Sequence, residues 1–350
     1  MESALRNRLI RAIEERVFPG AVVGIVGRDG KREIFAEGRF TYEPESPRVM
    51  ADTSYDVASI TKSIPTSSIA LKLIEEGKLS LDDKLVTHLP TYKNNYTHET
   101  LIRHLLTYAI IPDFPTPGFD VTKATAQEIG KNLPHVNLKA RPGEQAKYSN
   151  LPALLLSLVI ENITGSTVDK VGHGYFFKPL GMTNSTFFPR DQKSIPPTEI
   201  DEWRGLVQGF VHDETSFVLE KEHPMGCAGL FTNVPDILIF LEMLLNEGSL
   251  SGIKYFEPAT VAQMHTNQLS LPGVSMGLGW ELNEPRFMGN HVRPSTFGKT
   301  GFTGTLCVVD PERETAFAVL SNRTYPKRSS PDAINELRRD ISDIVLGTGA

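Results

Sequence analysis

The 350-residue sequence has few cysteines and no long apolar run. Its two cysteines, Cys227 and Cys307, exclude a framework of several disulfide bridges, and their apolar surroundings favour two buried free thiols. No uninterrupted apolar segment approaches the roughly 20 residues of a membrane-spanning helix, so we expect no membrane span. Residues 1–10 carry charges throughout and lack the apolar segment of a secretory signal. This predicts a cytoplasmic protein for the sequence as it stands, and a periplasmic or secreted one if a signal has been removed.

The sequence also lacks an excess of positive charge. Lysine and arginine number 36 against 42 aspartates and glutamates, a net charge of −6, which argues against binding to nucleic acid. The nine histidines form no His-Glu-x-x-His motif, and no other pattern indicates a metal ion or another cofactor. An apolar content of 40% with 22% charged residues is typical of a globular protein and excludes a disordered or fibrous chain. No feature of the sequence indicates an oligomeric state.

Strand patterns lie near both ends of the chain, and helical patterns lie between them. Residues 20–40 are typical of a hairpin, and further strands are predicted over 305–309 and 316–320. Helices are predicted up to about residue 13 and over 59–76, 99–108, 151–164, 234–247 and 332–346. We expect a kink or an irregular start at Pro65 in the second helix, and a proline-rich loop over 110–118.

This order of elements predicts an α/β (α+β) fold with one antiparallel sheet built from both chain ends and flanked by helices. The length fits one large two-part enzyme as well as two separate units. We expect residues 1–65 and 205–350 to form one sheet-containing domain and residues 66–204 to form a mostly helical inserted domain. The active site is expected at the junction of the two.

A Ser-x-x-Lys motif lies near the start of the second predicted helix, at Ser59 and Lys62. Side chains three residues apart lie on one face of a helix, so the lysine amine can reach the serine hydroxyl. The same spacing recurs at Ser251 and Lys254, where a glycine-containing loop indicates ordinary surface. The motif alone is therefore weak evidence for a nucleophile.

Two further motifs accompany it. Tyr148-Ser149-Asn150 stands where a loop enters a predicted helix, whereas a second Tyr-x-Asn triplet at Tyr92 lies in a polar run. Lys299-Thr300-Gly301 lies on a glycine-rich strand that a ligand or another backbone can approach closely.

Taken together and in this order, the three motifs resemble those of the serine β-lactamase and penicillin-binding protein superfamily, most closely its class C β-lactamase branch. The likeness extends from about residue 17 to 325. It includes segments 55–63, 76–83, 102–107, 142–143, 178–182, 211–213 and 277–280.

The resemblance implies that Ser59 attacks a carbonyl and forms an acyl-enzyme, which water then hydrolyses. It makes Lys62 and Tyr148 the other catalytic residues. Free lysine and tyrosine side chains have pKa values near 10, about three units too high for a base at pH 7. Cations beside Tyr148 favour a tyrosinate, but Lys62 and Lys299 also repel each other, so either lysine could instead be neutral. The identity of the base stays open at this point.

The resemblance also implies a set of substrate contacts. It places an oxyanion hole at the backbone N–H groups of Ser59 and Phe302, the latter following Gly301. Asn150 is expected to orient the substrate, and Lys299 with Thr300 is expected to hold a substrate carboxylate.

Three features depart from the family pattern. Residues 108–111, beginning with Tyr108, replace the His-Thr-Ser-Gly that relatives usually have, which indicates a rebuilt loop. Cys227 occupies a position where relatives often have histidine, and we expect an inert buried thiol there. The missing signal segment is the third departure. Trp280 is equally compatible with lining the pocket and with filling the core behind Lys299.

We therefore predict a serine hydrolase that acts on a small-molecule ester, amide or β-lactam, with or without a carboxylate. A D-stereospecific peptidase or penicillin-binding protein, an acyltransferase, and a non-catalytic relative that binds β-lactams or peptides are the alternatives. Substrate choice depends on loops, which are the least legible part of the sequence.

Overall fold

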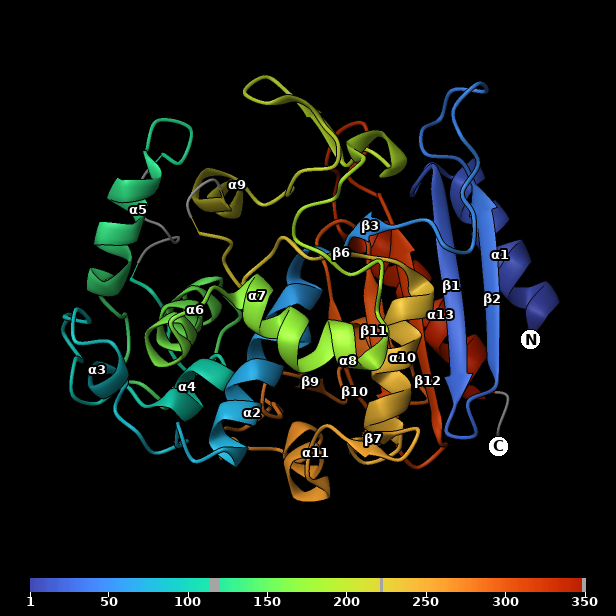
Figure 1. Cartoon of the computed structure of the whole chain (residues 1–350). Coiled ribbons are helices and arrows are strands. Elements are labelled where there is room, and N and C mark those ends of the chain that lie inside the picture. The colour runs from blue at the N-terminus through green and yellow to red at the C-terminus, as the bar shows by residue number, and fades with distance from the viewer. Residues whose placement is uncertain (114–119, 221–222, 348–350) are drawn as a thin grey trace.

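The structure is a computed structural model and describes residues 1–113, 120–220 and 223–347. Six strands form one antiparallel sheet in the order β2–β1–β12–β11–β10–β9. They are β1 (Gly20–Gly27), β2 (Arg32–Gly38), β9 (Glu281–Leu282), β10 (Phe297–Thr300), β11 (Leu306–Asp310) and β12 (Thr315–Ser321). The pairing of β1 with β12 joins the two chain ends within the sheet (Figure 1), which confirms the predicted fold class.

Alternating side chains of β1 face two separate apolar layers, as the two-residue period of a strand requires. Val23 packs in a cluster with residues of α1 (Glu2–Glu14) and α13 (Asp332–Gly347). Val22 packs in the second cluster with residues of α10 (Val234–Leu245). The sheet is therefore covered by helices on both faces (Figure 1).

Helices make up most of the structure between residues 58 and 180, on the opposite side of the molecule from β1 and β2 (Figure 1). They are α2 (Ser68–Glu75), α3 (Leu85–His88), α4 (Ile102–Leu106), α5 (Ala126–Asn132), α6 (Leu151–Thr164), α7 (Val168–Gly172) and α8 (Lys178–Leu180), with short 3₁₀ or π turns at Ala58–Lys62, Ser63–Ser67, Leu133–His135 and His173–Phe177. The division of the chain into a sheet-containing domain and a helical inserted domain stays a prediction.

Shorter elements complete the fold. Three two-stranded sheets pair β3 (Tyr55–Asp56) with β6 (Phe231–Thr232), β4 (Glu199–Asp201) with β5 (Gly205–Val207), and β7 (Ser249–Leu250) with β8 (Ile253–Lys254). The remaining helical segments are the 3₁₀ turn Gln192–Ser194, α9 (Glu214–Glu220), α11 (Pro258–Met264) and α12 (Pro285–Met288).

No single helix in the described ranges is long and apolar enough to cross a membrane. Two helical segments, residues 151–164 and 168–180, reach the length and hydropathy of a membrane span only when they are taken together, and the chain bends by 73° between them.

The segment predicted as a helix over 59–76 is interrupted where proline was expected to disturb it. A 3₁₀ turn over Ala58–Lys62 leads into the irregular Ser63–Ser67, in which Ile64 has non-helical angles (φ −120°, ψ 106°) directly before Pro65. Proline disfavours helical geometry in the residue that precedes it. Regular helix begins only at Ser68.

Several smaller predictions can be compared with the structure. Cys227 and Cys307 are buried free thiols. Trp280 is fully buried and packs edge-on against Phe297, which places it in the core. Ser251 lies exposed in the turn between β7 and β8, as expected for ordinary surface. Residues 114–118 of the predicted proline-rich loop lie outside the described ranges.

Candidate active site

A buried carboxylate fixes the turn that carries Ser59, the predicted nucleophile; this turn is called the nucleophile turn below. Ala58, directly before Ser59, has φ +47°, a conformation that is strained for a residue with a Cβ atom. The Ala58 N–H donates to Oδ1 of Asp56 at 2.7 Å, and the His212 N–H donates to Oδ2 at 2.7 Å. Burial raises the pKa of Asp56 to about 6. The fully buried Asp56 thus maintains the strained turn that presents Ser59.

Lys62 contacts the Ser59 hydroxyl directly. Its Nζ lies 2.8 Å from Ser59 Oγ and donates a second hydrogen bond to the Cys227 carbonyl at 2.7 Å. Burial alone would lower the pKa of Lys62, but attraction to Tyr148, Cys227 and Tyr108 outweighs burial and raises it. The direction of this pKa shift favours the ammonium form of Lys62 as the donor to Ser59 Oγ.

Tyr148 lies between two ammonium groups. Lys62 Nζ is 5.2 Å and Lys299 Nζ 4.6 Å from the centroid of the Tyr148 ring. Tyr108 packs beside it with ring centroids 5.2 Å apart, and Lys299 Nζ lies 4.4 Å from the Tyr108 ring centroid. The structure thus brings Ser59, Lys62, Tyr148 and Lys299 together, as the motifs predicted.

The environment of Lys299 differs from the one expected for a carboxylate-binding residue. Its side chain is fully buried, and Nζ forms an ion pair with Oε1 of Glu281 at 3.0 Å. Burial lowers the pKa of Lys299, but attraction to Glu281 and the two tyrosines outweighs burial and raises it. Because this ammonium is already paired with a protein carboxylate and does not line the cavity, the geometry argues against direct contact with a substrate carboxylate.

The turn that follows β10, over residues 301–305, comes very close to the nucleophile turn. A Cβ on Gly301 would lie 2.3 Å from the carbonyl oxygen of Val57, so only glycine permits this approach. Thr303 and Thr305 add hydrogen bonds from their hydroxyls to the carbonyls of Asp56 (2.8 Å) and Val57 (2.9 Å). The two chain segments that carry the predicted oxyanion donors are therefore bonded to each other.

Both predicted oxyanion donors are free to bind a ligand. Within the described residues, the backbone N–H groups of Ser59 and Phe302 donate no hydrogen bond. Both residues line one cavity, and the Phe302 side chain is 45% exposed.

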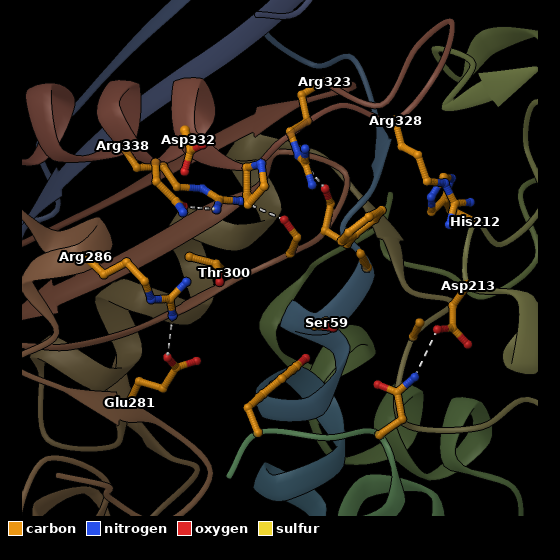
Figure 2. A pocket seen from close by; sticks show the side chains of 18 of the residues that line it. Ser59, His212, Asp213, Glu281, Arg286, Thr300, Arg323, Arg328, Asp332 and Arg338 are labelled. Atoms are coloured by element: carbon orange, nitrogen blue, oxygen red, sulfur yellow. Dashed lines mark hydrogen bonds and ion pairs between the residues drawn. The ribbon is translucent and has the colours of Figure 1, made fainter. Parts of the chain in front are cut away.

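That cavity has a volume of about 770 Å³ and opens over Ser59 (Figure 2). Its lining includes Ser59, Tyr148 and Asn150 from the nucleophile side and Thr300, Gly301 and Phe302 from the opposite strand. Asn150 Nδ2 donates to Asp213 Oδ2 at 3.0 Å. Of the five predicted substrate-binding residues, Asn150, Thr300, Gly301 and Phe302 line the cavity, whereas Lys299 does not.

Sequence reasoning missed Tyr108 and Glu281. Tyr108 has φ +54°, and its carbonyl accepts the Lys147 N–H at 3.0 Å, which places its ring beside Tyr148. The departure from the family pattern at residues 108–111 indicated an altered loop, but it did not indicate that the Tyr108 ring contacts Tyr148. Glu281 carries no motif, and its pairing with Lys299 follows from the β9–β10 register.

A serine with an adjacent lysine, a flanking tyrosine and two free backbone donors define an acyl-transferring serine hydrolase. The β-lactamase family model matches residues 6–339, and the chain belongs to this family.

The chain is also similar to several characterised or solved proteins. A Salmonella typhimurium protein named "Putative D-alanyl-D-alanine carboxypeptidase" is 29% identical over 320 residues, covering 81% of this chain and 72% of the relative. EstCE1, described as a hydrolase with promiscuous acyltransferase activity, superposes with a TM-score of 0.79 at 21% identity, covering 99% of this chain and 98% of its own. An octameric penicillin-binding protein homologue from Pyrococcus abyssi gives a TM-score of 0.74 at 24% identity, and the match covers 98% of this chain and 77% of the homologue. These solved structures share the fold of this chain.

Proposed function

We propose that this chain hydrolyses small, uncharged esters or amides through an acyl-enzyme on Ser59, in the manner of the class C branch of its family. The contact that supports this most strongly is the 2.8 Å hydrogen bond between Lys62 Nζ and Ser59 Oγ at the cavity wall. The free N–H groups of Ser59 and Phe302 would bind the oxyanion of the tetrahedral intermediate.

Tyr148 is the better candidate for the base. Attraction to neighbouring side chains raises the pKa of Lys62 and so favours its ammonium form, and an ammonium nitrogen has no lone pair with which to accept the serine proton. Lys62 and Lys299 place two amino groups within 5.2 Å of the ring centroid of Tyr148, the side chain that we propose as the base. In this proposal Tyr148 removes the Ser59 proton, while Lys62 orients the hydroxyl and stabilises the developing negative charge.

The pairing of Lys299 favours an uncharged acyl compound over a carboxylate held by that lysine. Lys299 is bonded to Glu281, and the half-exposed Phe302 offers apolar surface beside the nucleophile. A D-stereospecific carboxypeptidase is the second candidate, supported by the name of the Salmonella relative and by Arg286, an exposed guanidinium on the cavity wall. Its guanidinium pairs at 3.3 Å with a Glu281 carboxylate that Lys299 already shares.

The test compares three substrates: p-nitrophenyl butyrate, benzylpenicillin, and a D-alanyl-D-alanine peptide with a free or an amidated C-terminus. We expect turnover of the ester that is abolished in Ser59→Ala and unchanged in Ser251→Ala, the matched serine of the second Ser-x-x-Lys motif. Preferential cleavage of the free peptide acid would instead support the carboxypeptidase. Adding an alcohol and measuring the transferred ester separates hydrolysis from acyl transfer.

A Ser59-dependent adduct that never turns over would indicate a binding protein rather than an enzyme. Equal activity of wild type and Ser59→Ala would contradict the nucleophile assignment altogether.

A further inference from the structure

Two buried arginines bond to the backbone of the turn that carries the Phe302 N–H. The Arg338 guanidinium, on α13, donates through NH2 to the carbonyls of Gly301 at 2.7 Å and Thr305 at 2.9 Å. The Nε of Arg323 donates to the Phe302 carbonyl at 2.8 Å. Both arginines are at least 95% buried and line the cavity (Figure 2).

The Gly301 carbonyl and the Phe302 N–H belong to the same peptide unit. In a trans peptide these two groups point in opposite directions. A cation bonded to the oxygen on one side therefore polarises the N–H on the other side, because hydrogen bonds in series strengthen one another. Arg338 occupies that position on the peptide that carries the unpaired N–H of Phe302, a residue that lines the cavity.

Charge pairing does not explain why Arg338 is buried. Among the described residues it forms no ion pair with a carboxylate, its NH1 donates to the Asn335 amide oxygen at 2.9 Å, and its Nε has no partner. Burial, together with repulsion from Arg323 and Arg286, lowers the pKa of Arg338 to about 9, although attraction to Glu281 opposes this shift, so the group stays charged at neutral pH. Burying a cation that has no carboxylate in contact with it is costly, and a function in the site would account for that cost.

The same guanidinium also closes the turn. Gly301 N–H donates to the Thr305 carbonyl at 2.9 Å, and Gly304 N–H donates to the Gly301 carbonyl at 3.1 Å. Arg338 bonds to the two acceptor oxygens of this pair, so it fixes the orientation of the Gly301–Phe302 peptide as well as its polarity.

We propose that Arg338 is a positioning residue of the oxyanion hole, which aims and polarises the Phe302 N–H through the Gly301 carbonyl. This inference rests on the proposed acyl-enzyme function. It assigns to the C-terminal helix a part in transition-state stabilisation, although Arg338 itself touches no reacting atom.

The test uses the full chain with Arg338→Met, Arg338→Lys and the matched control Arg339→Met, which removes the neighbouring guanidinium from the same helix. The kcat and KM for p-nitrophenyl butyrate are measured per folded molecule, together with the affinity for phenylboronic acid. In the boronate adduct the Ser59 oxygen bonds to boron and loses its proton, and a boron-bound oxygen occupies the oxyanion position. Removing an oxyanion donor outright costs about 100-fold or more in kcat, so weakening one should cost about tenfold.

We expect Arg338→Met to lower kcat by about tenfold with KM little changed, and to weaken phenylboronic acid binding by a similar factor. The kcat and the boronate affinity of Arg338→Lys should lie between those of Arg338→Met and wild type, because a single ammonium cannot reproduce the planar guanidinium. Both quantities should equal the wild-type values in Arg339→Met. If Arg338→Met does not fold, the Arg338→Lys result decides.

An unchanged kcat, or a loss of kcat without loss of boronate affinity, in folded Arg338 variants would overturn this inference and leave the proposed function intact. A wild type that neither hydrolyses the ester nor binds the boronate would overturn both.

Discussion

Lys299 and Glu281 form a buried ion pair at the centre of the site, and its energetics can be tested separately from catalysis. Lys299 is fully buried, and the Glu281 side chain is 12% exposed. Breaking such a pair leaves an uncompensated charge, which is more destabilising than the pair is stabilising. Lys299 accordingly depends on Glu281 to stay charged next to Tyr148.

We predict that Glu281→Gln lowers the free energy of unfolding by about 3 kcal/mol at pH 7. In wild type the raised pKa of Lys299 contributes stability that is fully present below the unfolded-state pKa near 10.4 and is lost only at higher pH. In Glu281→Gln, burial lowers the pKa of Lys299 instead. The loss of unfolding free energy caused by this buried charge therefore becomes smaller as the pH rises toward about 10, where the lysine is neutral in both the folded and the unfolded state.

Urea unfolding at pH 7, 8.5 and 9.5 measures the difference between the two proteins. Glu312→Gln, which breaks the exposed pair with Arg293, is the control and should change little. A difference between wild type and Glu281→Gln that grows with pH would contradict this account of the pair.

The two tyrosines beside Lys299 should contribute unequally to catalysis. Tyr148→Phe removes the proposed base and should lower kcat/KM for p-nitrophenyl butyrate by about 100-fold or more. Tyr108→Phe removes the other phenol that faces Lys299 and should cost less than about tenfold, because Tyr108 is buried and does not line the cavity. Equal losses in the two variants would show that Tyr148 has no special part in proton transfer.

At the scale of elements, the close approach of the strand β10 and its following turn to the nucleophile turn decides whether the site forms. A Cβ on Gly301 would lie 2.0 Å from Thr305 Oγ1 and 2.3 Å from the Val57 carbonyl oxygen. We predict that Gly301→Ala lowers kcat/KM by more than about 100-fold, because it separates the Phe302 N–H from Ser59.

Gly130→Ala on α5 is the matched control. No atom lies within 4 Å of a Cβ built there, so this substitution should be neutral or slightly stabilising. Activity assays and thermal midpoints for both variants check the prediction, and wild-type turnover by Gly301→Ala would refute the close approach.

The elements themselves could largely be predicted from sequence, but several contacts in the site could not. Apolar periodicity located the helix Leu151–Thr164 and the strands at both chain ends, and the order of the motifs indicated Ser59, Lys62 and Tyr148. The positive φ of Tyr108 and the pairing of Lys299 with Glu281 depend on the path of a loop and on strand register, which periodicity does not specify. The carboxylate role predicted for Lys299 came from motif analogy alone, without knowledge of that partner.

At the scale of the whole molecule, the two chain ends support the site together. The first helix, α1, packs through Leu5 and Leu9 in the same apolar cluster as the residues of α13, the helix that carries Arg338. The sequence pattern predicted both helices, but it did not predict that they pack side by side on the same face of the sheet. This contact joins segments more than 300 residues apart, which periodicity cannot relate.

We predict that Leu9→Ala lowers the free energy of unfolding by about 3 kcal/mol, since Leu9 is fully buried in this layer. Ile10→Ala, at a neighbouring side chain that is 43% exposed, should change it by well under about 1 kcal/mol. Urea unfolding of both variants checks the placement of α1, and equal losses would contradict it.

The central claim, an acyl-enzyme on Ser59, is tested most directly by intact-mass measurement during reaction with p-nitrophenyl butyrate and with benzylpenicillin, followed by peptide mapping. The account predicts a transient mass increase equal to the acyl group in wild type and Ser251→Ala, located on the peptide that contains Ser59, and no increase in Ser59→Ala. Substrate turnover without any adduct, or an adduct that persists in Ser59→Ala, would contradict it.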